Sequence, residues 1–144
     1  MKLKAKGRFY MEVIDIASGD VIDRFDGKNL VVNSGILNVC HLLGGDVAGH
    51  ALTTIKVGTN PTAPALTDTA ITGAFSKAID SVAYVGNNIV QFIYSIDGTE
   101  ANGITIQEAG LFNSAGVLFA RKTRSAIVKT SAIALQGVWE IQIS

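Results

Sequence analysis

The chain has few of the residues that form cross-links or carry charge. Cys40 is the single cysteine among 144 residues, so an internal disulfide and a multi-cysteine metal site are excluded. Only 17% of the residues are charged, against roughly 25% in a typical soluble domain. We therefore expect some apolar surface to face a partner, and Cys40, which has apolar neighbours, to lie in the core.

An excess of charge of one sign is also missing. Twelve Lys and Arg residues balance twelve Asp and Glu residues, so no long-range field attracts nucleic acid or an anionic membrane. No apolar run is long enough for a membrane-spanning helix or a signal peptide. We expect a protein made in the cytoplasm and not secreted, with neither nucleic acid nor a membrane as partner.

The motifs of common enzymes and metal sites are not found. There is no G-x-S-x-G, H-E-x-x-H, P-loop or EF-hand spacing. We recognise no carboxylate or cysteine at ligand spacing from His41 or His50, and expect both to pack or to face solvent. The sequence therefore predicts no catalytic residue, no metal site, no cofactor and no enzyme.

Short segments with alternating apolar residues dominate the chain. Phe9, Met11 and Val13 alternate with polar residues, as in a half-buried strand. Further extended segments are expected at residues 21–25, 28–32, 54–57, 75–85, 89–96, 104–112, 117–121, 126–129 and 138–143. Such short strands in near-regular order predict one mainly β domain over residues 1–144, an antiparallel β-sandwich or jelly roll.

One helix is predicted between the early strands. Asn33 or Ser34 can cap its N-terminus, and Gly44 with Gly45 can end it. Apolar residues fill most positions from 36 to 43 and leave a narrow polar face. We therefore expect this short helix to be largely buried, against a sheet or a second subunit.

Two segments are expected to contact partners. A two-stranded ribbon is not stable alone, so the N-terminal hairpin 6–27 is a candidate assembly arm, with contacts through Phe9, Tyr10, Met11, Val21 and Phe25. The second is the proline-bearing loop 58–64, because loops held on a rigid scaffold often carry binding; its candidate contacts are Asn60, Pro61 and Pro64.

Glu108 is predicted to be paired. Apolar residues surround it in the sequence, and a lone carboxylate buried there would be costly. If the chain turns a hairpin at Gly116, Arg121 lies near Glu108 on the paired strand. We expect a cross-strand ion pair that fixes register more than it adds stability.

Three separate motifs occur in order along the chain. They are NLVVNSG at 29–35, IKVGTNPTAP with TDTA at 55–70, and ITIQEAGLFN, GVLFARK and IVKT between 104 and 130. Together they resemble a segment that recurs in tail-fibre, baseplate and other virion proteins of tailed bacteriophages. The resemblance covers residue 29 to the C-terminus and carries no catalytic or metal residue.

This resemblance implies a non-enzymatic virion structural protein. We expect a homo-oligomer that also binds other virion proteins, as an adaptor or accessory protein of the tail or baseplate. The alternative is a capsid decoration (cement) protein that binds the major capsid protein and bridges capsomers. A third interpretation is a host-surface carbohydrate-binding module, in which Trp139 and Tyr84 would be the sugar platforms, although such aromatic residues more often belong to a core.

Overall fold

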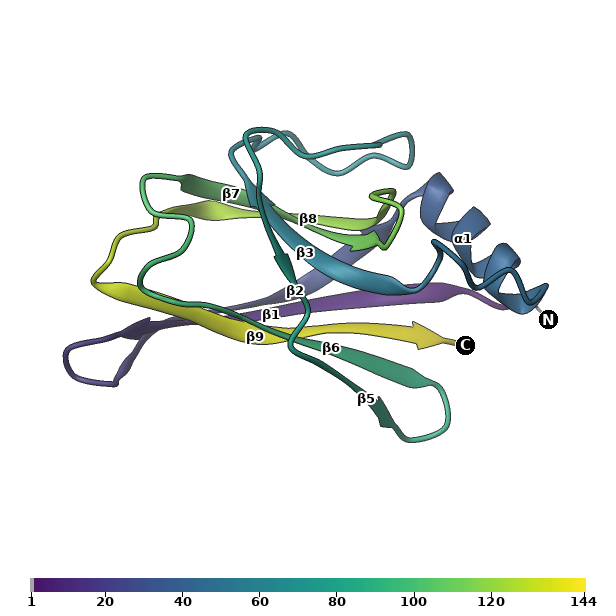
Figure 1. The fold of residues 1–144 in the computed structure, drawn as a ribbon, viewed down its shortest axis with the longest axis horizontal. Helices are drawn as coiled ribbons and strands as arrows, with labels where there is room; N and C mark the ends of the chain where they lie inside the picture. Colours follow the sequence, from purple (N-terminus) through teal and green to yellow (C-terminus); the bar gives the residue numbers. More distant parts are fainter. Residues whose placement is uncertain (1) are drawn as a thin grey trace.

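The computed structural model describes residues 2–144 and shows a mainly β fold (Figure 1). Within these residues, nine antiparallel strands form one curled sheet in the order β4-β3-β7-β8-β2-β1-β9-β6-β5. The strands are β1 (Ala5–Asp15), β2 (Val21–Val31), β3 (Leu52–Gly58), β4 (Phe75–Ala78), β5 (Ser81–Val85), β6 (Ile89–Ile96), β7 (Thr105–Asn113), β8 (Leu118–Val128) and β9 (Ile133–Ile143). The predicted mainly β chain is confirmed, whereas its assignment to a sandwich or jelly roll stays a prediction.

The sheet curls because one short segment of chain forms both of its edges. Residues 75–85 are expected as one strand, but the structure divides them into β4 and β5, the two edge strands. Between these strands the Ile79 N–H donates to Thr53 O, and the Asp80 N–H donates to Ile93 O. The break therefore moves the chain from one end of the strand order to the other, which requires the sheet to bend round.

The N-terminal hairpin belongs to the sheet of its own chain. β1 pairs with β2 on one side and with β9 on the other, along its whole length. Phe9 and Met11 are fully buried in the core, so they are corrected from partner contacts to core residues. Tyr10, Val21 and Phe25 are half-buried. The expected turn before residue 28 is wrong as well, because β2 runs unbroken from Val21 to Val31.

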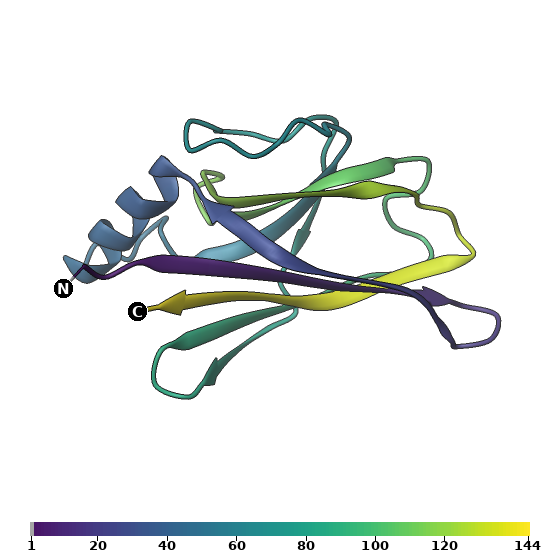
Figure 2. The ribbon, with the colours of Figure 1, turned by 180° about the vertical axis from the view of Figure 1, so that it is seen from behind.

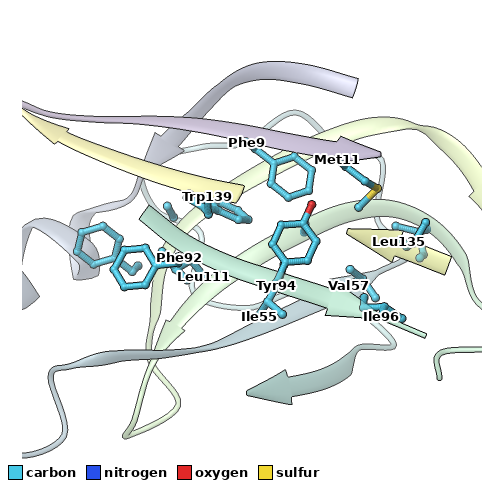
Figure 3. Close-up of a cluster of buried hydrophobic side chains, with 14 of the residues drawn as sticks. Phe9, Met11, Ile55, Val57, Phe92, Tyr94, Ile96, Leu111, Leu135 and Trp139 are labelled. Atoms are coloured by element: carbon cyan, nitrogen blue, oxygen red, sulfur yellow. The ribbon is translucent and has the colours of Figure 1, made fainter. Parts of the chain in front are cut away.

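An aromatic cluster fills the inside of the curl (Figure 3). The ring centroids of Phe9 and Tyr94 lie 5.8 Å apart, and those of Phe9 and Trp139 lie 4.9 Å apart. The Tyr94 hydroxyl donates to Tyr10 O at 2.8 Å, and burial raises the pKa of this phenol well above its usual value. With its side-chain oxygen facing the indole, Asn29 accepts from Trp139 Nε1 at 2.5 Å. The first motif thus reaches into the core.

Helix α1 (Asn33–Leu43) lies at one end of the sheet (Figures 1 and 2). The sheet does not bury the helix as predicted, because only Gly35 and Asn38 are buried; burial against a second subunit stays a prediction. The predicted side-chain cap is wrong too: the N-cap residue is Val32, without a side-chain hydrogen bond. Cys40 is exposed rather than in the core.

In the described part of the chain, no helix has the length and apolar character needed to cross a bilayer.

A glycine sets how closely α1 approaches the sheet. A Cβ at Gly35 would meet the backbone carbonyl of Phe119, with Val31 Cγ1 at 3.0 Å. Gly35→Ala is therefore expected to lower the free energy of unfolding by about 1–3 kcal/mol. Gly44→Ala is the matched control, since Gly44 has a φ of −78° and a Cβ there would lie 3.5 Å from its nearest neighbours. Urea unfolding that gives equal stability for both variants would contradict this packing role.

Candidate interaction surface and its buried anchors

The structure brings Glu108 and Arg121 together beneath the loop between β3 and β4. Both side chains are buried, and Arg121 Nε donates to Glu108 Oε1 at 2.9 Å. The pair crosses the β7–β8 hairpin diagonally, because Arg121 stands opposite Gly110, two residues along from Glu108. In a dry interior such a pair is favourable only if the remaining polar atoms also find partners.

Those partners come from the loop. Glu108 Oε2 accepts from the backbone N–H groups of Asn60 at 2.6 Å and Thr72 at 3.1 Å. The other Arg121 nitrogens donate to Asp68 Oδ2 at 3.0 Å and to Asn60 O at 3.1 Å. The pair therefore does more than set strand register, since it fixes both ends of a long loop to the sheet.

The anchored loop stands over the outer side of β7 and β8 in both views (Figures 1 and 2). Asn60 Oδ1 accepts from the Thr62 N–H at 3.0 Å, which tightens the turn at Pro61. Pro61 is exposed, whereas Asn60 and Pro64 are half-buried. The predicted contact residues of this loop thus lie on a segment that is held in place from below.

A second buried anchor joins the helix to the β7–β8 turn. Asn113 Nδ2 donates to Asn38 Oδ1 at 2.9 Å, and Asn38 Nδ2 donates to His50 O at 2.9 Å. Asn113 Oδ1 accepts from the backbone N–H groups of Ala115 and Val117. The two amides therefore connect α1, the loop after it and the end of the third motif.

Lys129 is a third anchor, at the opposite end of β7. Its ammonium group is fully buried and donates to Asn102 Oδ1 and Thr130 O, each at 2.9 Å. Burial lowers the pKa of Lys129, and the nearby carboxylates of Asp97 and Glu100 oppose that shift. The lysine of the IVKT segment thus holds the loop between β6 and β7.

The polar groups of the Glu108–Arg121 anchor are all hydrogen-bonded within the chain. Both oxygens of Glu108 and all three nitrogens of Arg121 have partners inside the chain. Groups that are satisfied in this way are held rigid. The motif residues of this network fix the shape of the molecule.

The exposed face of α1 is the clearest apolar surface. Leu43 is 82% exposed and Leu37 is 59% exposed, with Ile36, Cys40 and Val47 also open to solvent. A groove of about 1030 Å³ adjoins this face, lined in part by Ile36, Leu66 and Ile89. An apolar helix face of this kind usually marks an interaction site.

The two aromatic residues considered for sugar binding differ in burial and lie on different strands. Trp139 is fully buried in the core, on β9. Tyr84 is 83% exposed, on the edge strand β5. They do not form one platform, so only Tyr84 is open to a ligand.

The structure also brings together three residues that are separated in the sequence. His41 and His50 lie against Asp46, and their rings stack at a centroid distance of 4.3 Å. The expectation that no carboxylate has a ligand spacing is wrong, because Asp46 follows His41 by five residues and precedes His50 by four. The pattern H-x4-D-x3-H was the signal that could have found this cluster.

Comparisons with known proteins return no match. No family model, no curated protein and no solved structure matches this chain.

Proposed function

We propose that this chain is a non-enzymatic structural protein of a tailed-phage particle, which assembles as a homo-oligomer at the tail or baseplate. The observation that carries the proposal is what the polar residues of the virion-type motifs do in the structure. The polar residues Glu108, Arg121, Asn113 and Lys129 of the third motif form buried anchors within the chain. A rigid scaffold with held loops serves assembly, in which shape complementarity matters more than reactivity.

The curled sheet also fits this role. In the proposal it is a virion-type β-sandwich or jelly roll, with one half made of β5-β6-β9-β1-β2 and the other of β2-β8-β7-β3-β4. β2 belongs to both halves, because its last residues, Leu30 and Val31, pair with β8. Such a closed core leaves loops and one helix free for contacts between subunits.

Self-association is proposed through the exposed face of α1. The low charge content and formal net charge of zero give little repulsion between copies. The exposed residues Ile36, Leu37, Cys40 and Leu43 recur at helical spacing and form one stripe. A closed symmetric oligomer would bury this stripe against its copy or against a neighbouring sheet.

Leu37→Lys is expected to lower the oligomeric state without unfolding the chain. A lysine at this position adds a charge to the proposed contact, where desolvation makes it costly. Ile22→Lys on the N-terminal hairpin is the matched variant, because Ile22 is likewise 59% exposed. Size-exclusion chromatography with light scattering, at one fixed concentration, measures both.

The two variants separate two candidate contacts. Dissociation by Leu37→Lys alone supports the helix face, and dissociation by Ile22→Lys alone supports the hairpin as the assembly arm. A wild-type chain that stays monomeric at high concentration would contradict the homo-oligomer.

Two other functions follow from particular surfaces. A capsid decoration protein that bridges capsomers would use the rigid loop at Asn60, Pro61 and Pro64, which projects from the sheet. A host-surface carbohydrate-binding module would use Tyr84 on β5. Saturable glycan binding that Tyr84→Ala abolishes in a folded protein would favour the latter over both structural roles.

A further inference from the structure

The loop after α1 returns to the end of the helix and places three side chains at one point. The Asp46 N–H donates to His41 O at 2.9 Å, and the His50 N–H donates to Val47 O at 3.0 Å. Asn38 holds the carbonyl of His50 from the buried side of the helix. The backbone positions of His41, Asp46 and His50 are therefore fixed by hydrogen bonds that do not involve their own side chains.

Their side chains meet through the carboxylate. Asp46 Oδ2 lies 2.8 Å from His41 Nδ1 and 3.8 Å from His50 Nδ1. One ligand atom from each residue lies within 4.8 Å of the other two. His50 Nδ1 is buried and has no hydrogen-bond partner among the described residues. A buried nitrogen without a partner is costly, and a bound ion would remove that cost.

We propose that His41, Asp46 and His50 form a binding site for a divalent metal ion of the zinc class. Two imidazoles and a carboxylate suit Zn²⁺, Ni²⁺ or Cu²⁺ better than Mg²⁺ or Ca²⁺, which prefer oxygen ligands. Ligands about 2.0–2.2 Å from a tetrahedral ion stand about 3.3 Å apart. The two rings, which stack at a centroid distance of 4.3 Å, would have to rotate to bring these donors to that spacing, and the imidazoles bind as neutral groups.

The surroundings of the site favour a cation. It lies at the C-terminus of α1, where the helix dipole gives negative potential. His41 and Asp46 are exposed enough for water to complete the coordination. The anionic carboxylate between the two rings adds the charge that holds the ion.

Binding would change the helix end rather than the core. The metal would link the last turn of α1 to residues 46 and 50, beside the exposed apolar face of the helix. It would therefore stiffen the surface that the proposed assembly uses. The metal site itself does not depend on that proposal, because its test measures binding by the single chain.

The test is a calorimetric titration of the tag-free full chain with ZnCl₂, with thermal unfolding measured alongside. We expect about one Zn²⁺ per chain and a rise of about 3 °C or more in the thermal midpoint at saturation. Asp46→Asn and His50→Gln should each weaken the affinity by about tenfold or more. Far-UV circular dichroism checks that each variant is folded. If the His50 variant is unfolded, the variant at the exposed residue Asp46 decides the test.

Two control variants separate this site from adventitious binding. Cys40→Ser removes the exposed thiol next to His41, and Asp20→Asn removes an exposed carboxylate in the β1–β2 turn. Both should bind Zn²⁺ as the wild type does. The proposal is overturned by the absence of saturable binding, by unchanged affinity in Asp46→Asn, by loss of binding in Cys40→Ser, or by one ion per two chains.

Discussion

Replacing Arg121 by methionine is expected to lower the free energy of unfolding by about 3–5 kcal/mol. The change leaves the Glu108 carboxyl group fully buried without its cation, and removal of one partner of a buried pair costs about that much. It also releases Asp68 and the carbonyl of Asn60, so the loop between β3 and β4 should loosen. Urea unfolding followed by the fluorescence of Trp139 measures the loss.

A matched arginine serves as the control. Arg24 pairs with Glu12 at 3.3 Å on the surface, and Arg24→Met is expected to cost less than about 1 kcal/mol. The double variant Glu108→Gln with Arg121→Met should recover part of the loss, because a neutral amide oxygen still accepts from the Asn60 N–H. If Arg121→Met costs no more than Arg24→Met, or Glu108→Gln alone leaves stability and assembly unchanged, the anchor has no importance.

Trp139→Ala is the other change with a large expected effect. Its indole packs on Phe9 and is fully buried, so truncation should lower the free energy of unfolding by about 3–5 kcal/mol. It also leaves the Asn29 amide without its indole partner. Thermal unfolding followed by circular dichroism, which does not need the tryptophan, measures the change.

Tyr84→Ala is the matched aromatic control. Tyr84 stands on the edge strand β5 with most of its ring in solvent, so its removal should change stability by no more than about 0.5 kcal/mol. Similar losses for both variants would contradict the placement of Trp139 in the core and of Tyr84 at the edge. If Trp139→Ala loses glycan binding and Tyr84→Ala keeps it, the loss therefore reports unfolding of the Trp139 variant and not removal of a sugar contact.

The alternation of side chains allowed much of the sheet to be predicted. Successive residues of a strand point to opposite faces, so the pattern of Phe9, Met11 and Val13 indicated β1, and Trp139 with Ile141 indicated β9. The same logic placed Glu108 and Arg121 on paired strands, because the turn at Gly116 sets their register. Local periodicity was sufficient where both partners belong to one hairpin.

Features that depend on distant neighbours were not predictable in this way. The apolar residues of α1 indicated burial, but the helix meets β8 at Gly35 and the end of β7 through Asn38, and leaves the remaining stripe exposed. The loop was predicted as a surface segment, yet its attachment to Glu108 joins residues 48 positions apart. Periodicity carries no information about such tertiary contacts.

The cluster at the end of α1 shows a related limit. His41, Asp46 and His50 meet because the chain reverses after Gly45, whose φ is 86°, and a search for standard metal motifs does not include that turn. From the sequence, both histidines therefore had no recognised ligand partner, although Asp46 lies between them in the chain. Spacings that span a helix end need the geometry of the turn as well as the sequence.

The most direct test of the proposed role is to find the chain on purified phage particles. Particles would be separated into heads and tails, and each fraction would be probed by quantitative mass spectrometry and by imaging of labelled protein. We predict a fixed number of copies on every particle, all of them in the tail fraction. Copies covering the heads would instead favour the capsid decoration protein. Absence of the chain from particles of a phage that produces it would contradict the structural role.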